Sequence, residues 1–310
     1  MSQVGSTLGR VSLPLPRSLS PSKVASFKDC ALAFRYSVID HLPEPPSAPA
    51  SKGTLVHRAL ERLFSQVPAG HRTPAAAMDQ LDLAWSDLRF HPEFAGLALD
   101  QEAETEFRSD AARLVANYFE LEDPNQVRAV GIELMLEAKL GAMRLRGVID
   151  RLDLGPDGEL VITDYKTGRA PGIPFENSRL GGVHFYAFLC QQALGRRPAR
   201  VQLLHLGEPL AIVSVPTPQS IRGLQGRASA VWTAVERACA SEDFRPRPSR
   251  LCDWCAFQAH CPAFGGELVT AASAGPAPLT TPALPTNPEL PTNPALPTPA
   301  LPTGTHRPAL

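Results

Sequence analysis

The sequence predicts a single α/β domain whose core runs in the order helix, three strands, helix and strand. Between residues 127 and 166 apolar and charged residues alternate, as in the run from Ile132 to Glu137, which indicates a meander of three strands. Apolar residues at helical spacing follow near 178–194, and a further strand is expected at 200–206. The 310 residues are 44 % hydrophobic, which is enough to bury one sizeable core.

The segment before this core is expected to begin unstructured and then to form two helices. Residues 1–20 lack a continuous apolar run, so we expect a disordered N-terminus without a signal peptide. A first helix is expected at 21–37, and a proline-rich connector at 43–49 separates it from the next. Within residues 53–64 apolar side chains recur at helical spacing, with His57 at the edge of the apolar stripe.

An insertion at 74–121 separates the second helix from the strands. It is rich in Ala, Leu and charged residues at helical spacing, so a helical subdomain is expected. Trp85 and Tyr118 lie in it, and aromatic side chains can stack on unpaired bases. Aromatic residues at helical spacing are more typical of a core, which is the role we expect for both.

The folded domain is expected to span residues 21–264 and to be followed by a tail at 265–310. A long helix near 217–240 leads to its last segment. Beyond it Leu-Pro-Thr recurs, starting at Leu284, Leu290, Leu296 and Leu301. Proline at this density excludes helix and sheet, so we expect a disordered, extended tail that is either a spacer, a ligand for a partner or a tolerated repeat.

Acidic and basic residues gather on two of the predicted strands. Gly155-Pro156-Asp157-Gly158 suits a tight turn, so the flanking strands should pair antiparallel and bring Asp150 toward Asp164. Residues two apart on a strand share a face, which places Lys166 beside Asp164 and turns Tyr165 to the other side. Two carboxylates and a lysine should therefore converge.

This group of side chains suits a metal-dependent hydrolase. Two close carboxylates repel unless a proton or cation separates them, and oxygen ligands suit Mg²⁺ or Mn²⁺. A lysine beside that ion can position a water molecule and stabilise charge on a phosphate. The alternative is an ordinary surface salt bridge between Asp164 and Lys166.

Cysteines make a second constellation near the end of the folded domain. Of the six cysteines, three form a Cys-x2-Cys-x5-Cys cluster at 252–261: Cys252, Cys255 and Cys261. Without a signal peptide a reducing compartment is expected, which favours metal binding over disulfides. The spacing suits structural zinc and an iron-sulfur cluster equally well. Cys190 and Cys239 lie in apolar helical stretches and are expected to be small buried residues.

The strings Gly-x-x-Asp-Arg-x-Asp, beginning at Gly147, and Asp-Tyr-Lys-Thr-Gly, beginning at Asp164, resemble the catalytic motifs of the PD-(D/E)XK nuclease superfamily, specifically its RecB/AddB-like branch. The resemblance covers roughly residues 20–264 and implies a restriction-endonuclease-like αβββαβ core. It also implies that His57, on its upstream helix, is a metal ligand.

The resemblance assigns a role to each residue of the predicted site. His57, Asp150, Asp164 and the Tyr165 carbonyl would hold Mg²⁺ or Mn²⁺, and Lys166 would position the attacking water. Tyr186 and Arg151 are candidate DNA contacts, whereas Asp153 is expected to face solvent as a partner of Arg151. One departure is Gly182, where the family frequently carries Gln; His184 or Gln191 would have to substitute for it.

Related nucleases of the AddB type and of CRISPR adaptation close the domain with a 4Fe-4S cluster. By that resemblance Cys30, in a helix similar to the family's opening helix, would join Cys252, Cys255 and Cys261 as its ligands. Such a clamp would join the N- and C-terminal parts of the domain. The alternative remains a structural Zn²⁺.

The resemblance implies a metal-dependent deoxyribonuclease, of exonuclease type, acting in DNA repair or recombination. The alternative is a nuclease fold that binds DNA ends or a helicase partner with little cleavage. The chain has no phosphate-binding loop of its own, so a helicase would act in trans. A formal charge of −1 excludes a strongly basic nucleic-acid binder, and no apolar run is as long as a membrane span, so a cytoplasmic protein is expected.

Overall fold

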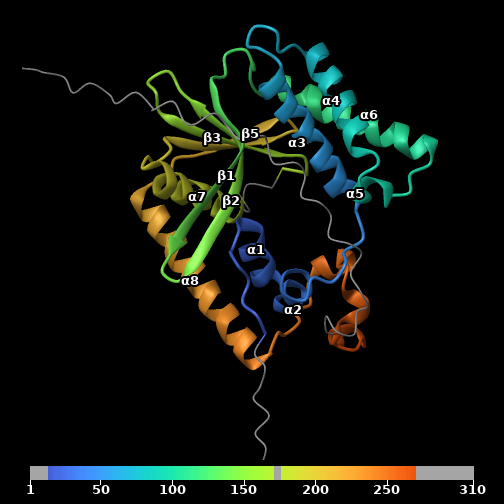
Figure 1. Cartoon of the computed structure of the whole chain (residues 1–310), viewed down its shortest axis with the longest axis vertical. Coiled ribbons are helices and arrows are strands. Elements are labelled where there is room, and N and C mark those ends of the chain that lie inside the picture. The colour runs from blue at the N-terminus through green and yellow to red at the C-terminus, as the bar shows by residue number, and fades with distance from the viewer. Residues whose placement is uncertain (1–12, 171–175, 270–310) are drawn as a thin grey trace, which may run out of the picture. The chain divides into compact units, whose positions relative to one another are not determined.

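The computed structural model describes residues 13–170 and 176–269 (Figure 1). In chain order the main helices are α1 (Pro21–Asp29), α2 (Ala31–Phe34), η1 (Arg35–Ile39, a π-helical turn), α3 (Ala48–Gln66), α4 (Pro74–Leu88), α5 (Pro92–Ala95), α6 (Gln101–Leu121), α7 (Glu176–Leu194) and α8 (Pro218–Ser241). The strands are β1 (Ala129–Leu140), β2 (Met143–Leu154), β3 (Leu160–Lys166), β4 (Arg200–His205) and β5 (Leu210–Ser214). The predicted order of helix, three strands, helix and strand is therefore present as α3, β1 to β3, α7 and β4.

The five strands form one mixed sheet in the order β1-β2-β3-β4-β5. Only β3 and β4 pair in parallel, and α7 lies on the crossover between them. The strands β1 and β2 join through two residues, of which Gly141 has a φ of 60° that glycine tolerates without a Cβ clash. The edge strand β5 was not predicted from the sequence.

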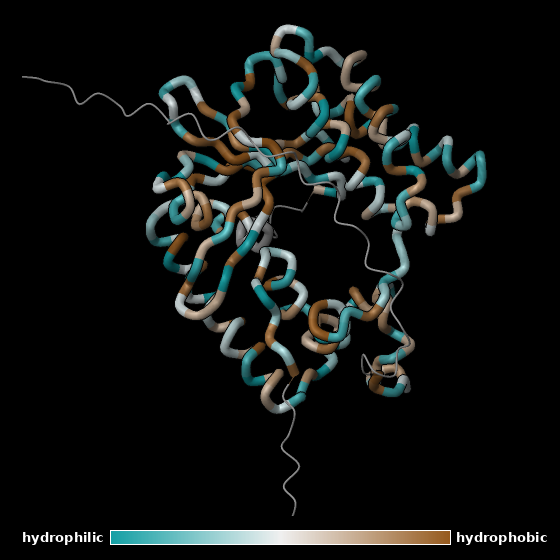
Figure 2. Tube along the Cα trace, in the orientation of Figure 1, coloured by the Kyte–Doolittle hydropathy of each residue, from teal (hydrophilic) through white to brown (hydrophobic). Residues whose placement is uncertain are grey.

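The sheet carries a hydrophobic core on each side. One core packs sheet residues such as Ile162 and Leu203 against α7 and α8. The other packs α3, α4 and α6 around Tyr165 and Leu204. Brown apolar segments accordingly gather where the helices meet the strands in Figure 2. Because β3 is buried on both sides, the residues at its end are held in a fixed position.

The insertion at 74–121 is helical, as predicted, and supports α3. Trp85 is 6 % exposed and Tyr118 is fully buried, so both aromatic residues belong to the core rather than to a surface that could stack on bases. Gly53 on α3 lies close to the end of β3, since a Cβ there would stand 3.2 Å from the Thr167 Oγ1. This close approach brings α3, with His57, next to the end of β3.

The two ends of the described chain lie against each other. The Tyr36 hydroxyl donates to the His260 carbonyl at 3.0 Å, and the Arg247 guanidinium donates to the Lys28 carbonyl at 2.9 Å. Segments more than two hundred residues apart in the sequence are thus joined, and Figure 1 shows α1 and α2 beside the last, orange part of the chain.

Three boundary predictions need correction. The first helix does not run through 21–37, because Cys30 is extended, with φ of −158°, and separates α1 from α2. Residues 13–20, expected to be disordered, are placed, and Leu19 is fully buried. Residues 265–269 of the expected disordered tail are described as well, and Val269 packs against the core, whereas residues 1–12 and 270–310 lie outside the described residues. Among the helices that the structure describes, none is long and apolar enough to cross a membrane.

Candidate active site

The hairpin of β2 and β3 brings the two predicted aspartates together. Arg151 pairs with Thr163 in the antiparallel register, which sets Asp150 across from Asp164. The Tyr165 amide donates to the Asp150 Oδ2 at 2.7 Å and fixes that carboxylate. The pKa of Asp164 is raised to about 6, first by burial and then by the nearby negative charge of Asp150. Two carboxylates in this position favour a shared cation.

Lys166 lies beside Asp164, as the alternation predicted. Its ammonium forms an ion pair with the Asp164 Oδ2, while the lysine side chain is 44 % exposed and the aspartate only 4 %. The lysine therefore combines a buried anionic partner with access to solvent. Tyr165, between them, points to the opposite core.

His57 reaches the hairpin from α3. Its Nδ1 lies 3.5 Å from the Asp150 Oδ2, and its Nε2 lies 3.1 Å from the Tyr165 carbonyl oxygen. Burial disfavours the charged ring, but the hydrogen bond and charge of Asp150 outweigh it, so the pKa of His57 is raised. The structure thus brings together His57, Asp150 and the Tyr165 carbonyl, all of which were predicted as metal ligands.

Glu133 on β1 is a site residue that the sequence analysis missed. Glu133, His57 and Asp150 each offer a ligand atom, and these atoms lie within 4.8 Å of one another. The pKa of Glu133 is raised to about 7 by burial and then by Asp150. Its φ of 45° is unfavourable for a residue with a side chain, and such strain often accompanies a functional position.

The donor set fits a divalent metal ion. Carboxylate and carbonyl oxygens with one imidazole suit Mg²⁺ or Mn²⁺, and a cation would relieve the repulsion that raises the carboxyl pKa values. Asp164 lies next to this group, but its Oδ2 faces the ammonium of Lys166. Within the described chain no other group of three such side chains is as closely spaced.

Asp164 and Lys166 open into a cleft of about 750 Å³ between β2, β3, α7 and the N-terminal segment. Tyr186 on α7 lines the cleft and stands against Gly147, where a Cβ would lie 3.0 Å from its ring. The side chains of His184 and Gln191 do not line it, so neither takes the place of the missing Gln at Gly182.

Residues 18–262 match the family model described as the PD-(D/E)XK nuclease superfamily. The matched residues include the hairpin, α3 and all four predicted cysteine ligands. The chain belongs to the PD-(D/E)XK nuclease superfamily. Members of this superfamily use divalent metal ions, which agrees with the donors found around Asp150. No curated protein matches the chain.

Solved structures resemble this superfamily member at low identity. A "Putative exonuclease" from Eubacterium rectale is 14 % identical, with a TM-score of 0.49 over 77 % of this chain and 87 % of that one. The protein SSO0001 is 13 % identical, with a TM-score of 0.37 over 80 % and 86 % of the two chains. Protein VC1899 from Vibrio cholerae is 15 % identical, with a TM-score of 0.22 over 70 % and 58 %.

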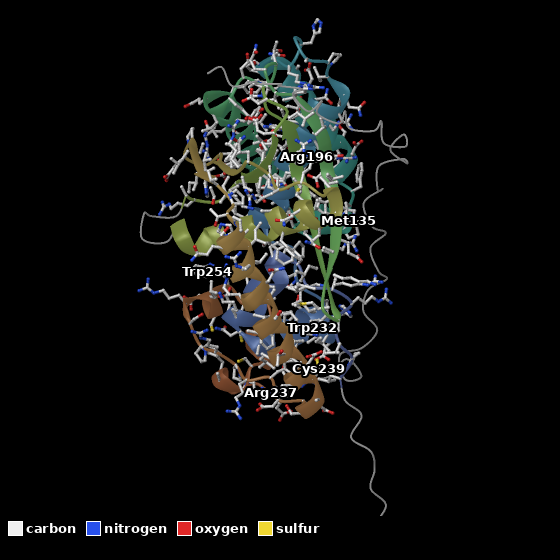
Figure 3. The ribbon with its side chains drawn as sticks, turned by 90° about the vertical axis from the view of Figure 1, so that its left-hand side faces the viewer. Met135, Arg196, Trp232, Arg237, Cys239 and Trp254 are labelled. Atoms are coloured by element: carbon white, nitrogen blue, oxygen red, sulfur yellow. The ribbon has the colours of Figure 1, made fainter. Side chains whose placement is uncertain are left out.

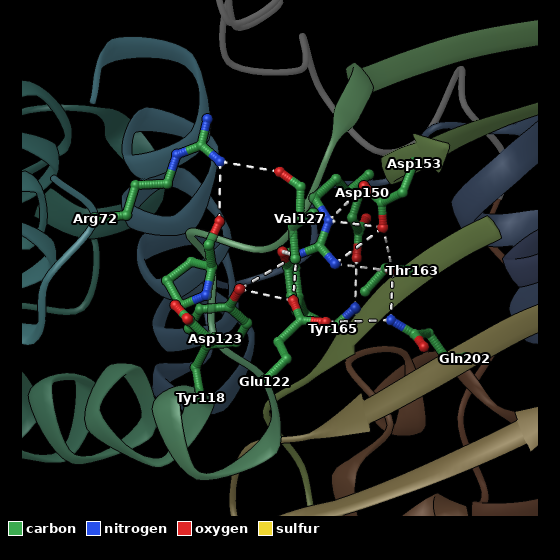
Figure 4. Close-up of polar contacts among 12 residues, drawn as sticks. Arg72, Tyr118, Glu122, Asp123, Val127, Asp150, Asp153, Thr163, Tyr165 and Gln202 are labelled. Carbon is green, nitrogen blue, oxygen red and sulfur yellow. Dashed lines mark hydrogen bonds and ion pairs between the residues drawn. The ribbon is translucent and has the colours of Figure 1, made fainter. Parts of the chain in front are cut away.

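A buried polar network centred on Arg151 lies on the Tyr165 side of the hairpin. Figure 4 shows its members Glu122, Asp153, Thr163 and Tyr165. The Arg151 guanidinium donates to Asp153 at 2.8 Å and to the Tyr165 hydroxyl at 2.6 Å, and it pairs with Glu122 at the end of α6. Arg151 is 1 % exposed and Asp153 is 6 % exposed. The prediction that Arg151 contacts DNA is therefore wrong, and Asp153 is its partner in the interior rather than in solvent.

The four predicted cysteine ligands line one cavity of about 450 Å³. Burial raises the pKa of the Cys255 thiol, and the neighbouring Cys30, Cys252 and Cys261 raise it further, because one thiolate disfavours another. Backbone amides of Arg247 and Ser249 lie within hydrogen-bonding distance of the Cys30 and Cys252 sulfurs. Cys190 and Cys239 are buried elsewhere, at 0 % and 2 % exposure, which confirms their predicted role in packing.

Proposed function

We propose that this superfamily member is a metal-dependent deoxyribonuclease of the RecB-family exonuclease type, acting on DNA in repair or recombination in the cytoplasm. The observation that carries the proposal is the group of His57, Glu133 and Asp150 beside the ion pair of Asp164 and Lys166. The exonuclease type and the repair role rest on the resemblance of the motifs to the RecB/AddB-like branch.

His57, Asp150, Asp164 and the Tyr165 carbonyl would hold Mg²⁺ or Mn²⁺, with Glu133 as an added ligand. The bound ion would supply a water of lowered pKa and compensate charge on the phosphate. Lys166 orients the attacking water and donates to the phosphate oxygen on which charge develops. The amide of Tyr165 keeps Asp150 oriented, and His57 of α3 lies against the same carboxylate oxygen.

A 4Fe-4S cluster held by Cys30, Cys252, Cys255 and Cys261 is part of the proposal. All four cysteines line one cavity, and the other three lie near enough to Cys255 to raise the pKa of its thiol. The choice of the iron-sulfur cluster over the alternative Zn²⁺ rests on the resemblance to the AddB-type and CRISPR-adaptation nucleases.

The second candidate is a module that binds DNA ends or a helicase partner without effective cleavage. The observation in its favour is that Gly182 stands where the family frequently carries Gln and that neither His184 nor Gln191 lines the cleft in the described part of the chain. The closely grouped ligands and Lys166 favour the hydrolase, because a binding module has no use for a strained, acidic cluster beside a lysine.

Digestion of end-labelled single- and double-stranded DNA separates the two functions. Anaerobically purified wild type is compared with Asp164→Ala and Lys166→Ala in Mg²⁺ or Mn²⁺. Cleavage that needs metal and is lost in both variants supports the nuclease, and the product ladder gives its polarity. DNA binding without cleavage by the folded wild type would support the binding module instead.

A further inference from the structure

Two positively charged residues line the cleft into which Asp164 and Lys166 open. Lys23, in the first turn of α1, and Arg146, on β2, line the same cleft as Asp164 and Lys166. Neither residue takes part in the group of metal ligands or in the buried Arg151 network. The pair is therefore available for a role that the hydrolytic residues do not fulfil.

The backbone of the N-terminal segment holds the two cations next to each other. The Leu19 amide donates to the Arg144 carbonyl, and the Arg146 amide donates to the Leu19 carbonyl, each at 2.9 Å. The Ser20 hydroxyl then caps α1 by accepting from the Lys23 amide at 3.2 Å. Leu19, fully buried, thus fixes the start of α1 beside β2.

Among the described residues, the carboxylate opposite Arg146 on the neighbouring strand, that of Glu137, pairs with Arg144 instead. Within residues 13–170 and 176–269 neither side chain makes an ion pair, and the one described partner of the Lys23 ammonium is the Ser18 carbonyl at 3.3 Å. Burial lowers the pKa of Lys23, and the charge of Arg146 lowers it further. Two close cations in a partly desolvated wall repel each other, and a bound anion would remove that repulsion.

The surroundings leave room for a strand of nucleic acid. Small residues line this part of the cleft, namely Ser18, Ser20, Ser22, Ala25, Gly147 and Gly182. Hydroxyl groups of Ser20 and Ser22, 2.9 Å apart, add donors beside the two cations. A phosphodiester backbone combines a negative charge with acceptor oxygens, which matches this set of donors.

We propose that Lys23 and Arg146 form a subsite that binds an internal backbone phosphate of the DNA strand, flanking the phosphate that is cleaved. The proposal rests on the proposed nuclease function, since the same strand must reach Lys166. The subsite positions the strand and reads no base, so its contribution is the same for every sequence.

The test measures equilibrium binding of fluorescently labelled single-stranded DNA to the full chain in EDTA, where no cleavage occurs. Lys23→Ala and Arg146→Ala are each expected to weaken binding about fivefold or more, equally for unrelated sequences. The double variant should reduce the slope of log affinity against log salt by about 0.7 or more, the value for one phosphate on a single strand. Lys23→Arg should retain binding.

Two exposed cations away from the cleft serve as matched controls. Lys28→Ala removes the same charge from the other end of α1, and Arg237→Ala removes one from α8, where Figure 3 labels it near Cys239. Both are expected to bind as wild type does. Thermal melting of each variant verifies that the fold is kept.

The outcomes separate the subsite from the nuclease. If the wild type cleaves DNA and the Lys23→Ala and Arg146→Ala variants bind DNA as well as the wild type does, the subsite is overturned and the proposed function stays intact. If the wild type does not cleave DNA but both variants bind it more weakly, the subsite is supported and the hydrolase is overturned. A wild type that neither binds nor cleaves DNA would overturn both.

Discussion

Glu133 has both a strained backbone conformation and a side chain at the proposed metal site. Its left-handed φ costs on the order of 1 kcal/mol, and the carboxyl that this conformation directs to His57 and Asp150 carries a raised pKa. A pKa near 7 means that the carboxyl is largely protonated at pH 6 and ionised at pH 8. Metal ligands must be deprotonated, so metal and protons compete for this site.

Metal affinity should therefore rise with pH. Calorimetric titration of Mn²⁺ into the wild type is expected to give tighter binding near pH 8 than near pH 6, since Asp164, with a pKa of about 6, and Glu133, with one of about 7, must lose their protons. Glu133→Gln should weaken binding about tenfold or more near pH 8 and reduce the pH dependence.

Glu137→Gln is the matched control on the same strand. Glu137 is exposed and pairs with Arg144, outside the ligand group. It should bind Mn²⁺ as the wild type does at both pH values. Equal affinities for wild type and Glu133→Gln would show that Glu133 is not a ligand.

Among the elements, the β2 and β3 hairpin depends on the buried Arg151. The guanidinium holds Asp153 on its own strand, Tyr165 and Thr163 on β3, and Glu122 at the end of α6. One residue thus links the catalytic strand to the helical insertion. Removing one member of a buried ion pair leaves a charge without a partner and is strongly destabilising.

Arg151→Met is expected to lower the free energy of unfolding by about 3–5 kcal/mol. Urea unfolding followed by circular dichroism measures the change. Arg144→Ala, which breaks the exposed pair with Glu137 on the same strand, should cost less than about 1 kcal/mol. Similar small losses in both variants would mean that the network does not hold the hairpin.

Hairpin geometry explains which parts of the site the sequence could predict. Turn residues and alternation were enough to pair Asp150 with Asp164 and to place Lys166. The same reasoning could have found Glu133, because a two-residue turn at Gly141 sets Glu133 across from Asp150. The burial of Arg151 could not be predicted, since it depends on the packing of α6 on the far side of the sheet, which brings Glu122 to the guanidinium.

At the scale of the whole molecule, Cys30 from the N-terminal part and Cys252, Cys255 and Cys261 from the C-terminal part line one cavity beside α1. Val24 and Phe27 of α1 are partly buried against the core, and the helix is flanked by the buried Leu19 before it and by Cys30 after it. Lys23 lies on this helix. The position of the N-terminal cleft wall should accordingly depend on whatever group the cysteines bind.

Cys30→Ser is expected to lose the visible absorption of an iron-sulfur group and to lower the Tm by about 6 °C or more. The reason is that cluster binding contributes several kcal/mol to folding, and 1 kcal/mol corresponds to about 2–4 °C in a domain of this size. Differential scanning calorimetry under anaerobic conditions measures the shift. Cys239 is a buried cysteine outside the cavity, so Cys239→Ala should keep the absorption. A colourless wild type that contains zinc would contradict the iron-sulfur assignment.

The central claim is that the residues at the end of β3 hydrolyse DNA, and single-turnover cleavage with Mg²⁺ tests it most directly. Lys166→Ala should bind DNA with an affinity close to that of the wild type but cleave it about 10²–10³-fold more slowly, because the group that stabilises the developing charge is gone. Lys139→Ala, an exposed lysine on β1, should cleave at the wild-type rate. Cleavage by Lys166→Ala at the wild-type rate would contradict the account.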